Sequence, residues 1–133
     1  MKKILLAVSL CLTVFAFGQS ALNVIPAPAK ATVSKGSFTL SNATKIILAG
    51  NGTEKSAAFL NQYLQEVYGF QLPVQKEKAQ KNAIILTLGK SDNKPVGAYT
   101  MTVDKNKIAI TASSEQGVFY GIQSLLQLLP AER

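Results

Sequence analysis

The clearest hydrophobic pattern in the sequence lies near the C-terminus. Five apolar residues recur at helical spacing within about 100° of arc, and they are Val118, Ile122, Leu125, Leu126 and Leu129. Gln123 and Gln127 lie on the opposite side, and Pro130 ends the run. Residues 117–129 are therefore predicted to form a helix with one face buried against a core.

An earlier stretch has the same period. Apolar residues share one helical face between residues 54 and 68, namely Ala57, Leu60, Leu64 and Val67. Thr53 before them suits a helix N-cap, and Gly69 stands where a glycine commonly ends a helix. A second helix is predicted over residues 54–68.

Apolar runs and strict alternation predict six strands. They are two short strands within 31–40 around the turn Ser34-Lys35-Gly36, followed by 45–49, 83–88, 99–103 and 107–111. The continuous apolar run 83–88 is typical of a strand in the centre of a sheet. The alternation in 99–111 predicts an antiparallel hairpin with one buried face.

The predicted order is three strands, a helix, three strands and a helix. A helix with one apolar stripe needs a sheet face to cover. We therefore expect a two-layer α+β fold, with a largely antiparallel or mixed sheet and two helices packed on one face. The 133 residues suffice for one domain.

The first 18 residues have the pattern of a secretory signal peptide. Lys2 and Lys3 precede an apolar run over residues 4–17, and small residues stand before Gln19. The run is shorter than the roughly 20 residues needed to cross a bilayer. We expect residues 1–18 to be cleaved, leaving residues 19–133 as an exported domain that is not held in a membrane.

Charge does not indicate a nucleic-acid partner. The net charge is +7, and removing Lys2 and Lys3 with the signal peptide lowers it to +5. The remaining lysines are scattered, and Arg133 is the only arginine. Arginine makes most bidentate contacts to phosphate and guanine, so nucleic-acid binding is not expected.

The residue types exclude several classes of chemistry. There is no histidine, and Cys11 would leave with the signal peptide. Triads that use histidine, thiol nucleophiles and the usual zinc sites are therefore not expected, and no cofactor, metal or catalytic residue is predicted. Seven carboxylates are read as solvated side chains: Glu54, Glu66, Glu77, Asp92, Asp104, Glu115 and Glu132.

Small residues line one flank of the predicted C-terminal helix, at Gly117, Gly121 and Ser124. Each glycine inside a helix costs about 1 kcal/mol relative to alanine, so two on one flank indicate a close approach. The approaching group is either the domain's own sheet or another domain. Interdomain packing is the functional hypothesis for these three residues, beside a close contact with the domain's own sheet.

Three motifs together resemble a known family. They are Ile25-Pro26-x-Pro28, the hairpin over 99–110, and Gly117-x-Phe119-Tyr120-Gly121-x-Gln123-Ser124-Leu125-Leu126-Gln127-Leu128. The set looks like the N-terminal domain of glycoside hydrolase family 20, the β-N-acetylhexosaminidases. The likeness runs from Asn23 to Pro130, with Ser124 where threonine is common.

This resemblance implies that a (β/α)₈ barrel follows the domain and carries the chemistry. Family members remove terminal N-acetylhexosamine residues from glycans by substrate-assisted retention, using an Asp-Glu pair in the barrel. Neither residue has a counterpart here, and a barrel takes about 250 residues. The resemblance therefore implies a non-catalytic N-terminal domain or fragment of an exported enzyme.

Three alternatives remain open at this stage. The chain could be a freestanding carbohydrate-binding or interaction module that uses aromatic side chains as a stacking platform, namely Tyr63, Tyr68, Phe70 and Phe119. It could precede the barrel of another glycosidase. It could also be a remnant of a truncated gene.

Overall fold

The computed structural model describes residues 22–76, 81–89 and 95–131. Its elements, in chain order, are β1 (Lys45–Ala49), α1 (Glu54–Tyr68), β2 (Val74–Gln75), β3 (Ala83–Leu88), β4 (Tyr99–Val103), β5 (Lys107–Ala112) and α2 (Glu115–Leu128). The predicted signal peptide lies outside the described residues. None of the described helices is both long and apolar enough to span a bilayer.

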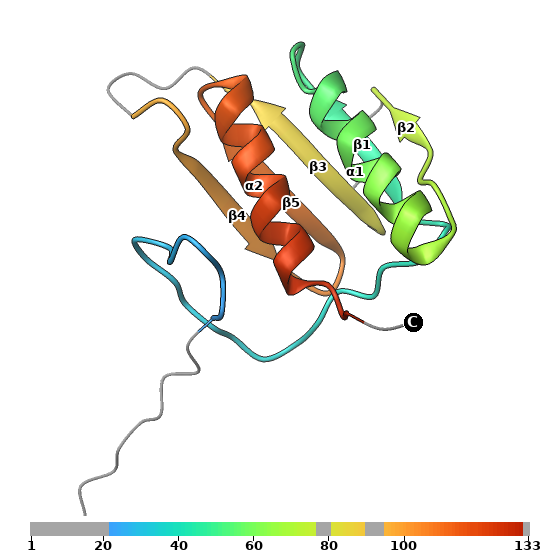
Figure 1. Cartoon of the computed structure of the whole chain (residues 1–133), viewed down its shortest axis with the longest axis horizontal. Coiled ribbons are helices and arrows are strands. Elements are labelled where there is room, and N and C mark those ends of the chain that lie inside the picture. Colours follow the sequence, from blue (N-terminus) through green and yellow to red (C-terminus); the bar gives the residue numbers. More distant parts are fainter. Residues whose placement is uncertain (1–21, 77–80, 90–94, 132–133) are drawn as a thin grey trace, which may run out of the picture.

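The strands form one mixed sheet in the order β2-β1-β3-β5-β4. Neighbouring strands run parallel except β4 and β5, which are antiparallel. Both helices lie side by side over the same face of this sheet (Figure 1). The predicted two-layer α+β fold with a mixed sheet is confirmed, as is the antiparallel hairpin of residues 99–111.

The core lies between the sheet and the helix layer. Strand β3 occupies the centre of the sheet, as its continuous apolar run predicted. Its Ile84 stands in register between Ile46 of β1 and Ile108 of β5, and all three side chains are buried. Side chains from both helices pack against these strand residues and complete the hydrophobic core. The buried helix residues of this core are Ala57, Leu60, Leu64, Val118, Ile122 and Leu125. Both apolar stripes predicted from the sequence thus face this sheet.

The two strands predicted within residues 31–40 are wrong. That segment contains no strand, and most of its side chains are exposed. Phe38 and Leu40 pack against the core, whereas Val33 is 57% exposed. Only the last apolar side chains of the segment contact the core. The segment therefore buries too little apolar area to stabilise a pair of hydrogen-bonded strands. The two-residue strand β2, which the sequence pattern did not predict, borders β1 instead.

Three helix ends carry typical capping residues, and two of these, Thr53 and Gly69, stand where the sequence predicted them. Ser114 accepts a hydrogen bond from the backbone N–H of Gly117, which caps α2. Gly69 adopts the left-handed conformation at the end of α1, with φ of 78°. Thr53 is the N-cap residue of α1, but its buried hydroxyl makes no hydrogen bond in the described structure.

A side-chain amide holds the chain that returns from α1 to the sheet. Asn61 donates to the carbonyl of Leu72 and accepts from its backbone N–H, both at 2.8 Å. Leu72 is 3% exposed, so the bonds satisfy two polar groups beside the core. They fix the segment from which β2 begins.

Candidate functional site

The small-residue flank of α2 lies against the domain's own strands. A Cβ at Gly117 would be 2.6 Å from the carbonyl oxygen of Ala98 and 2.7 Å from Cβ of Ala112. A Cβ at Gly121 would overlap Cγ2 of Ile110. Ser124 is 4% exposed, and its hydroxyl is hydrogen-bonded to that of Tyr99.

All three small residues therefore allow α2 to pack closely against β4 and β5, and against Ala98 just before β4. This is the first of the two alternatives that the sequence left open, a close contact within the domain. An additional interdomain role for Gly117, Gly121 and Ser124 stays a prediction.

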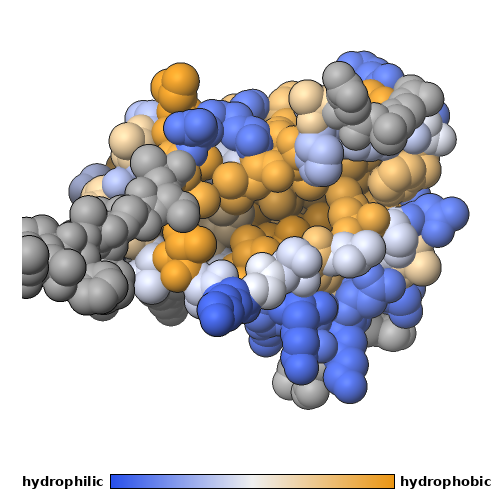
Figure 2. Space-filling view, turned by 90° about the horizontal axis from the view of Figure 1, so that it is seen from below, coloured by the Kyte–Doolittle hydropathy of each residue, from blue (hydrophilic) through white to orange (hydrophobic). Residues whose placement is uncertain are grey.

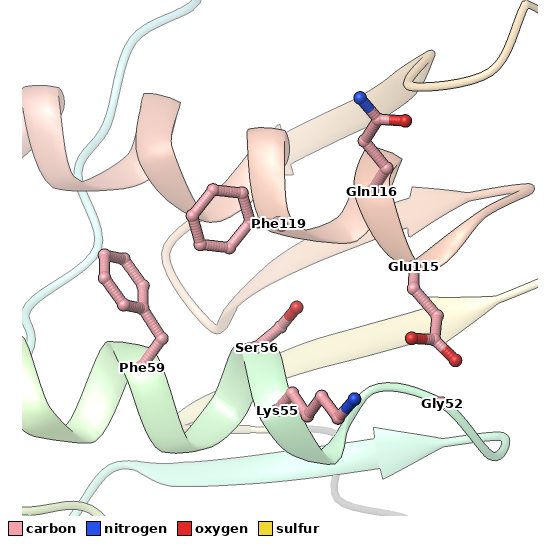
Figure 3. A pocket seen from close by; sticks show the side chains of 7 residues that line it. All are labelled: Gly52, Lys55, Ser56, Phe59, Glu115, Gln116 and Phe119. Atoms are coloured by element: carbon pink, nitrogen blue, oxygen red, sulfur yellow. The ribbon is translucent and has the colours of Figure 1, made fainter.

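The outer side of the helix layer carries a shallow apolar groove between the N-terminal halves of α1 and α2 (Figure 3). The groove has a volume of about 290 Å³. The rings of Phe59 and Phe119 contact each other at one end of it, with centroids 5.0 Å apart and ring planes tilted by 55°. Its other lining residues are Gly52, Lys55, Ser56, Glu115 and Gln116, whose polar groups lie toward one end.

The structure divides the four aromatic residues proposed as a stacking platform into two groups. Tyr63, Tyr68 and Phe70 form a chain of tilted ring contacts at the C-terminal end of α1, with centroids 6.3 to 6.5 Å apart. Phe119 instead pairs with Phe59 in the groove. Sequence reasoning missed Phe59, although its place one residue before the buried Leu60 marks it as lying beside the core stripe.

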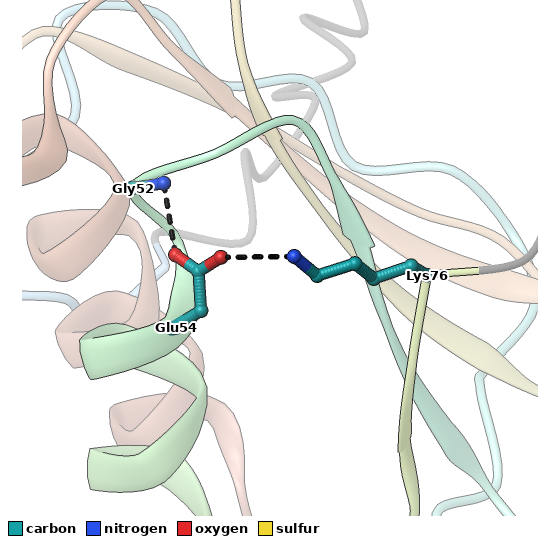
Figure 4. A network of polar contacts seen from close by, with 3 residues as sticks. All are labelled: Gly52, Glu54 and Lys76. Atoms are coloured by element: carbon teal, nitrogen blue, oxygen red, sulfur yellow. Dashed lines mark hydrogen bonds and ion pairs between the residues drawn. The ribbon is translucent and has the colours of Figure 1, made fainter.

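Two carboxylates approach the turn that enters α1. Glu54 accepts a hydrogen bond of 2.8 Å from the backbone N–H of Gly52 and lies 3.5 Å from Nζ of Lys76 (Figure 4). From the other side, Oε1 of Glu115 would lie 2.9 Å from a Cβ on Gly52. Gly52 has φ of 91°, so this crowded, left-handed position favours glycine.

Hydrogen bonds from the backbone hold the pKa of Glu54 below its usual value of 4.5, first from its own N–H and then from that of Gly52. Lys76 contributes less to this shift. A general acid that works near neutral pH needs a raised pKa. Glu54 is therefore suited to capping α1 and unsuited to acid catalysis.

We predict that Glu54→Gln makes the unfolding free energy fall less steeply, as the pH is lowered, than it does in the unsubstituted chain. Because the pKa of Glu54 is lower in the folded state, its ionised form contributes stability above pH 4.5, and this contribution is lost as the pH falls through the lowered value. Urea unfolding at a series of pH values between about 3 and 7 measures the effect. Lys76→Gln is the matched control and should retain most of the pH dependence, since the backbone bonds dominate. If Lys76→Gln weakened the pH dependence as much as Glu54→Gln does, the assignment of the pKa shift to the backbone hydrogen bonds would be contradicted.

Asp104, another described carboxylate, has a role in local structure. Asp104 accepts hydrogen bonds from the backbone N–H groups of Asn106 and Lys107 in the β4–β5 turn, which lower its pKa. Within residues 22–76, 81–89 and 95–131, no group of three acidic, histidine or cysteine side chains could hold a metal ion.

Known proteins are similar to this chain in sequence and in fold. Residues 21–133 match the family model described as glycosyl hydrolase family 20, domain 2. The chain is 32% identical over 112 residues to a β-hexosaminidase of Porphyromonas gingivalis, a match that covers 84% of this chain and 14% of the relative.

Solved structures agree. A family 20 β-N-acetylhexosaminidase of Streptomyces coelicolor superimposes with a TM-score of 0.73 at 26% identity, over 84% of this chain and 22% of that one. An exo-β-N-acetylglucosaminidase of Vibrio harveyi gives 0.70 at 27% identity, over 83% of this chain and 16% of that one. This chain thus spans less than a quarter of the length of each of these relatives. The family match, which includes all of the described residues, shows that the chain belongs to glycosyl hydrolase family 20.

Proposed function

We propose that this chain is the non-catalytic N-terminal domain of an exported β-N-acetylhexosaminidase that removes terminal N-acetylhexosamine residues from glycans. The observation that carries the proposal is the family match over residues 21–133, combined with coverage of only 14% of the Porphyromonas gingivalis β-hexosaminidase. In this proposal a catalytic (β/α)₈ barrel follows the domain and holds the substrate.

Two of the described carboxylates have surroundings that do not suit acid catalysis. Glycoside hydrolysis needs an acid whose pKa is raised toward the working pH. Glu54 and Asp104 are instead held ionised by backbone N–H groups. Both side chains act in local structure, one at the start of α1 and the other in the β4–β5 turn.

The outer side of the helix layer is the surface that we propose packs against the barrel. Phe59 of α1 and Phe119 of α2 are only half buried there, and Tyr120 of α2 is 43% exposed. The C-terminal end of the described chain lies at the same layer, because the hydroxyl of Tyr68 in α1 donates to the carbonyl of Pro130. A domain that follows Pro130 would start beside Tyr68, at the C-terminal end of this layer. If it extended over the outer side of the helices, it would cover the half-buried rings of the groove and bury apolar area.

The same aromatic side chains define the alternative, a freestanding glycan-binding module. Tyr68 and Phe70 pack against the core, and the rings in both groups are tilted by 46 to 56° to one another. A sugar ring stacks best on a flat exposed face. These contacts therefore favour packing over glycan binding.

An activity assay tests the non-catalytic role. Purified residues 19–133 should release no chromophore from a chromogenic N-acetylglucosaminide above the buffer rate, whereas the Porphyromonas gingivalis relative serves as the active control. Turnover by the purified domain would contradict the proposal. Saturable NMR shifts of the Phe59 and Phe119 rings on titration with N-acetylglucosamine oligomers would favour the binding module instead.

Export has its own test. Expression of the whole chain in a bacterial host should yield a secreted or periplasmic product whose mass corresponds to a chain starting at Gln19. A product that retains Met1 in the cytoplasm would contradict the proposed export without affecting the family assignment.

A further inference from the structure

The N-terminal segment is tied to α2 by one side-chain amide. Gln127 accepts from the backbone N–H of Ile25 at 2.8 Å and donates to its carbonyl at 2.9 Å. These two bonds join residues that are 102 positions apart in the sequence. Val24, directly before Ile25, is 6% exposed and anchors the segment further. We call residues 22–28 the N-terminal strap.

The strap fixes an exposed apolar side chain in place. Ile25 is 82% exposed although both of its backbone polar groups are bonded, and Leu22 is 40% exposed. Leu128, the neighbour of Gln127 in α2, is 38% exposed. No charged residue lies within residues 22–28. The strap therefore presents an ordered, neutral and apolar surface next to the end of α2.

The strap lies toward a largely apolar side of the molecule. In Figure 1 the N-terminal segment and the C-terminal ends of both helices lie at the bottom of the view. Figure 2, seen from below, shows apolar side chains gathered over a hollowed area in the centre of that side. Apolar patches on a soluble protein mark interaction surfaces when they are contiguous.

The chain itself indicates what covers this surface. Gln127 is three residues before Pro130, where the bond from Tyr68 holds the outgoing chain. A chain extends at most about 3.6 Å per residue, so the first residues after Pro130 stay close to this end of α2. The relatives of this chain are several times longer, and the part that follows the domain in them would begin within reach of Ile25.

We propose that the N-terminal strap and Leu128 form a docking surface for the domain that follows α2 in the full-length protein. This inference rests on the proposed function, and it adds the first residues of the mature chain to the contact with the barrel. The reciprocal bonds of Gln127 order the strap before docking, so less conformational freedom is lost when Ile25 is covered.

A chimera tests the proposal. Residues 22–131 of this chain replace the matching segment of the Porphyromonas gingivalis β-hexosaminidase, and the half-life of activity at an elevated temperature is measured. Ile25→Asp should shorten this half-life roughly fivefold or more, because it places a charge in an apolar contact. Gln127→Ala should produce part of the effect and speed hydrogen exchange of the Ile25 amide. Val33→Asp, a change at an exposed position outside the strap, should have no effect.

The isolated chain separates a docking role from a role in the domain's own fold. There Ile25→Asp should shift the melting temperature by no more than about 2 °C, as expected for an exposed position. A chimera with Ile25→Asp that is as durable as the unsubstituted chimera would overturn the inference and leave the proposed function standing. The inference would also be overturned if Ile25→Asp destabilised the isolated chain as much as the chimera, or if it converted a dimer of the isolated chain into monomers. An unsubstituted chimera that is inactive beside an active parent enzyme would overturn the proposed function itself.

Discussion

Gly121→Leu is expected to unfold the domain or lower its melting temperature by roughly 10 °C or more, a cost of about 3 kcal/mol or above. Even the first carbon of a new side chain would overlap Cγ2 of Ile110 and lie 3.2 Å from Cδ2 of Tyr99. Ile110 is fully buried and branched at Cβ, so it cannot turn aside cheaply. Thermal unfolding followed by circular dichroism measures the loss.

Alanine substitutions make the same test in a graded form. Alanine is favoured over glycine in a helix by about 1 kcal/mol, so a stabilising effect at residue 121 would be expected if the flank were open. We expect Gly121→Ala to destabilise instead. Gly89→Ala is the matched control, because no atom lies within 4 Å of a Cβ there and its φ is not positive. If Gly121→Ala were as stable as the unsubstituted chain, the close contact with β5 would be contradicted.

Much of the fold follows from local pattern in the sequence. The helix predicted over 54–68 coincides with α1, and the strands predicted over 45–49, 83–88 and 99–103 coincide with β1, β3 and β4. In each case the apolar period is long enough to specify the element, and the turn or cap residues agree with it. Gly69 and Ser114 show how a single residue can mark a helix end.

Other features depend on contacts that the local pattern does not contain. The alternation in residues 31–40 is compatible with strands, yet only Phe38 and Leu40 reach the core. Strand β2 has two residues, too few for any period, and exists because β1 offers it a parallel partner. The parallel pairing of β1 with β3 arises because α1 crosses over the sheet between them.

The candidate surfaces were predictable only in part for the same reason. Sequence spacing placed Gly117, Gly121 and Ser124 on one flank, but it could not say which group approaches them. The structure brings Ile110 and Tyr99 there. The groove of Phe59 and Phe119 and the bond from Gln127 to Ile25 join distant segments, so neither has a signature at short range.

Core truncation should produce a second large effect, and adjacent residues of β3 provide a matched pair. Ile84 is fully buried beneath the helix layer, whereas Ile85 points to the opposite face and is half buried. Ile84→Ala should cost about 2 to 5 kcal/mol of unfolding free energy, because it removes buried carbons and leaves a cavity. Ile85→Ala should cost about 1 kcal/mol, in proportion to the smaller apolar area it buries. Urea unfolding of both variants measures the difference.

The comparison also tests how the sheet is used. If the two helices alone cover the sheet, stability should depend on the alternate β3 residues that face them, and Ile84→Ala should be several-fold more harmful than Ile85→Ala. Equal costs would show that the opposite face is packed as tightly as the helix face. That result would show that the side away from α1 and α2, where Ile47 of β1 is already buried, is covered over β3 as well, and it would contradict a two-layer arrangement.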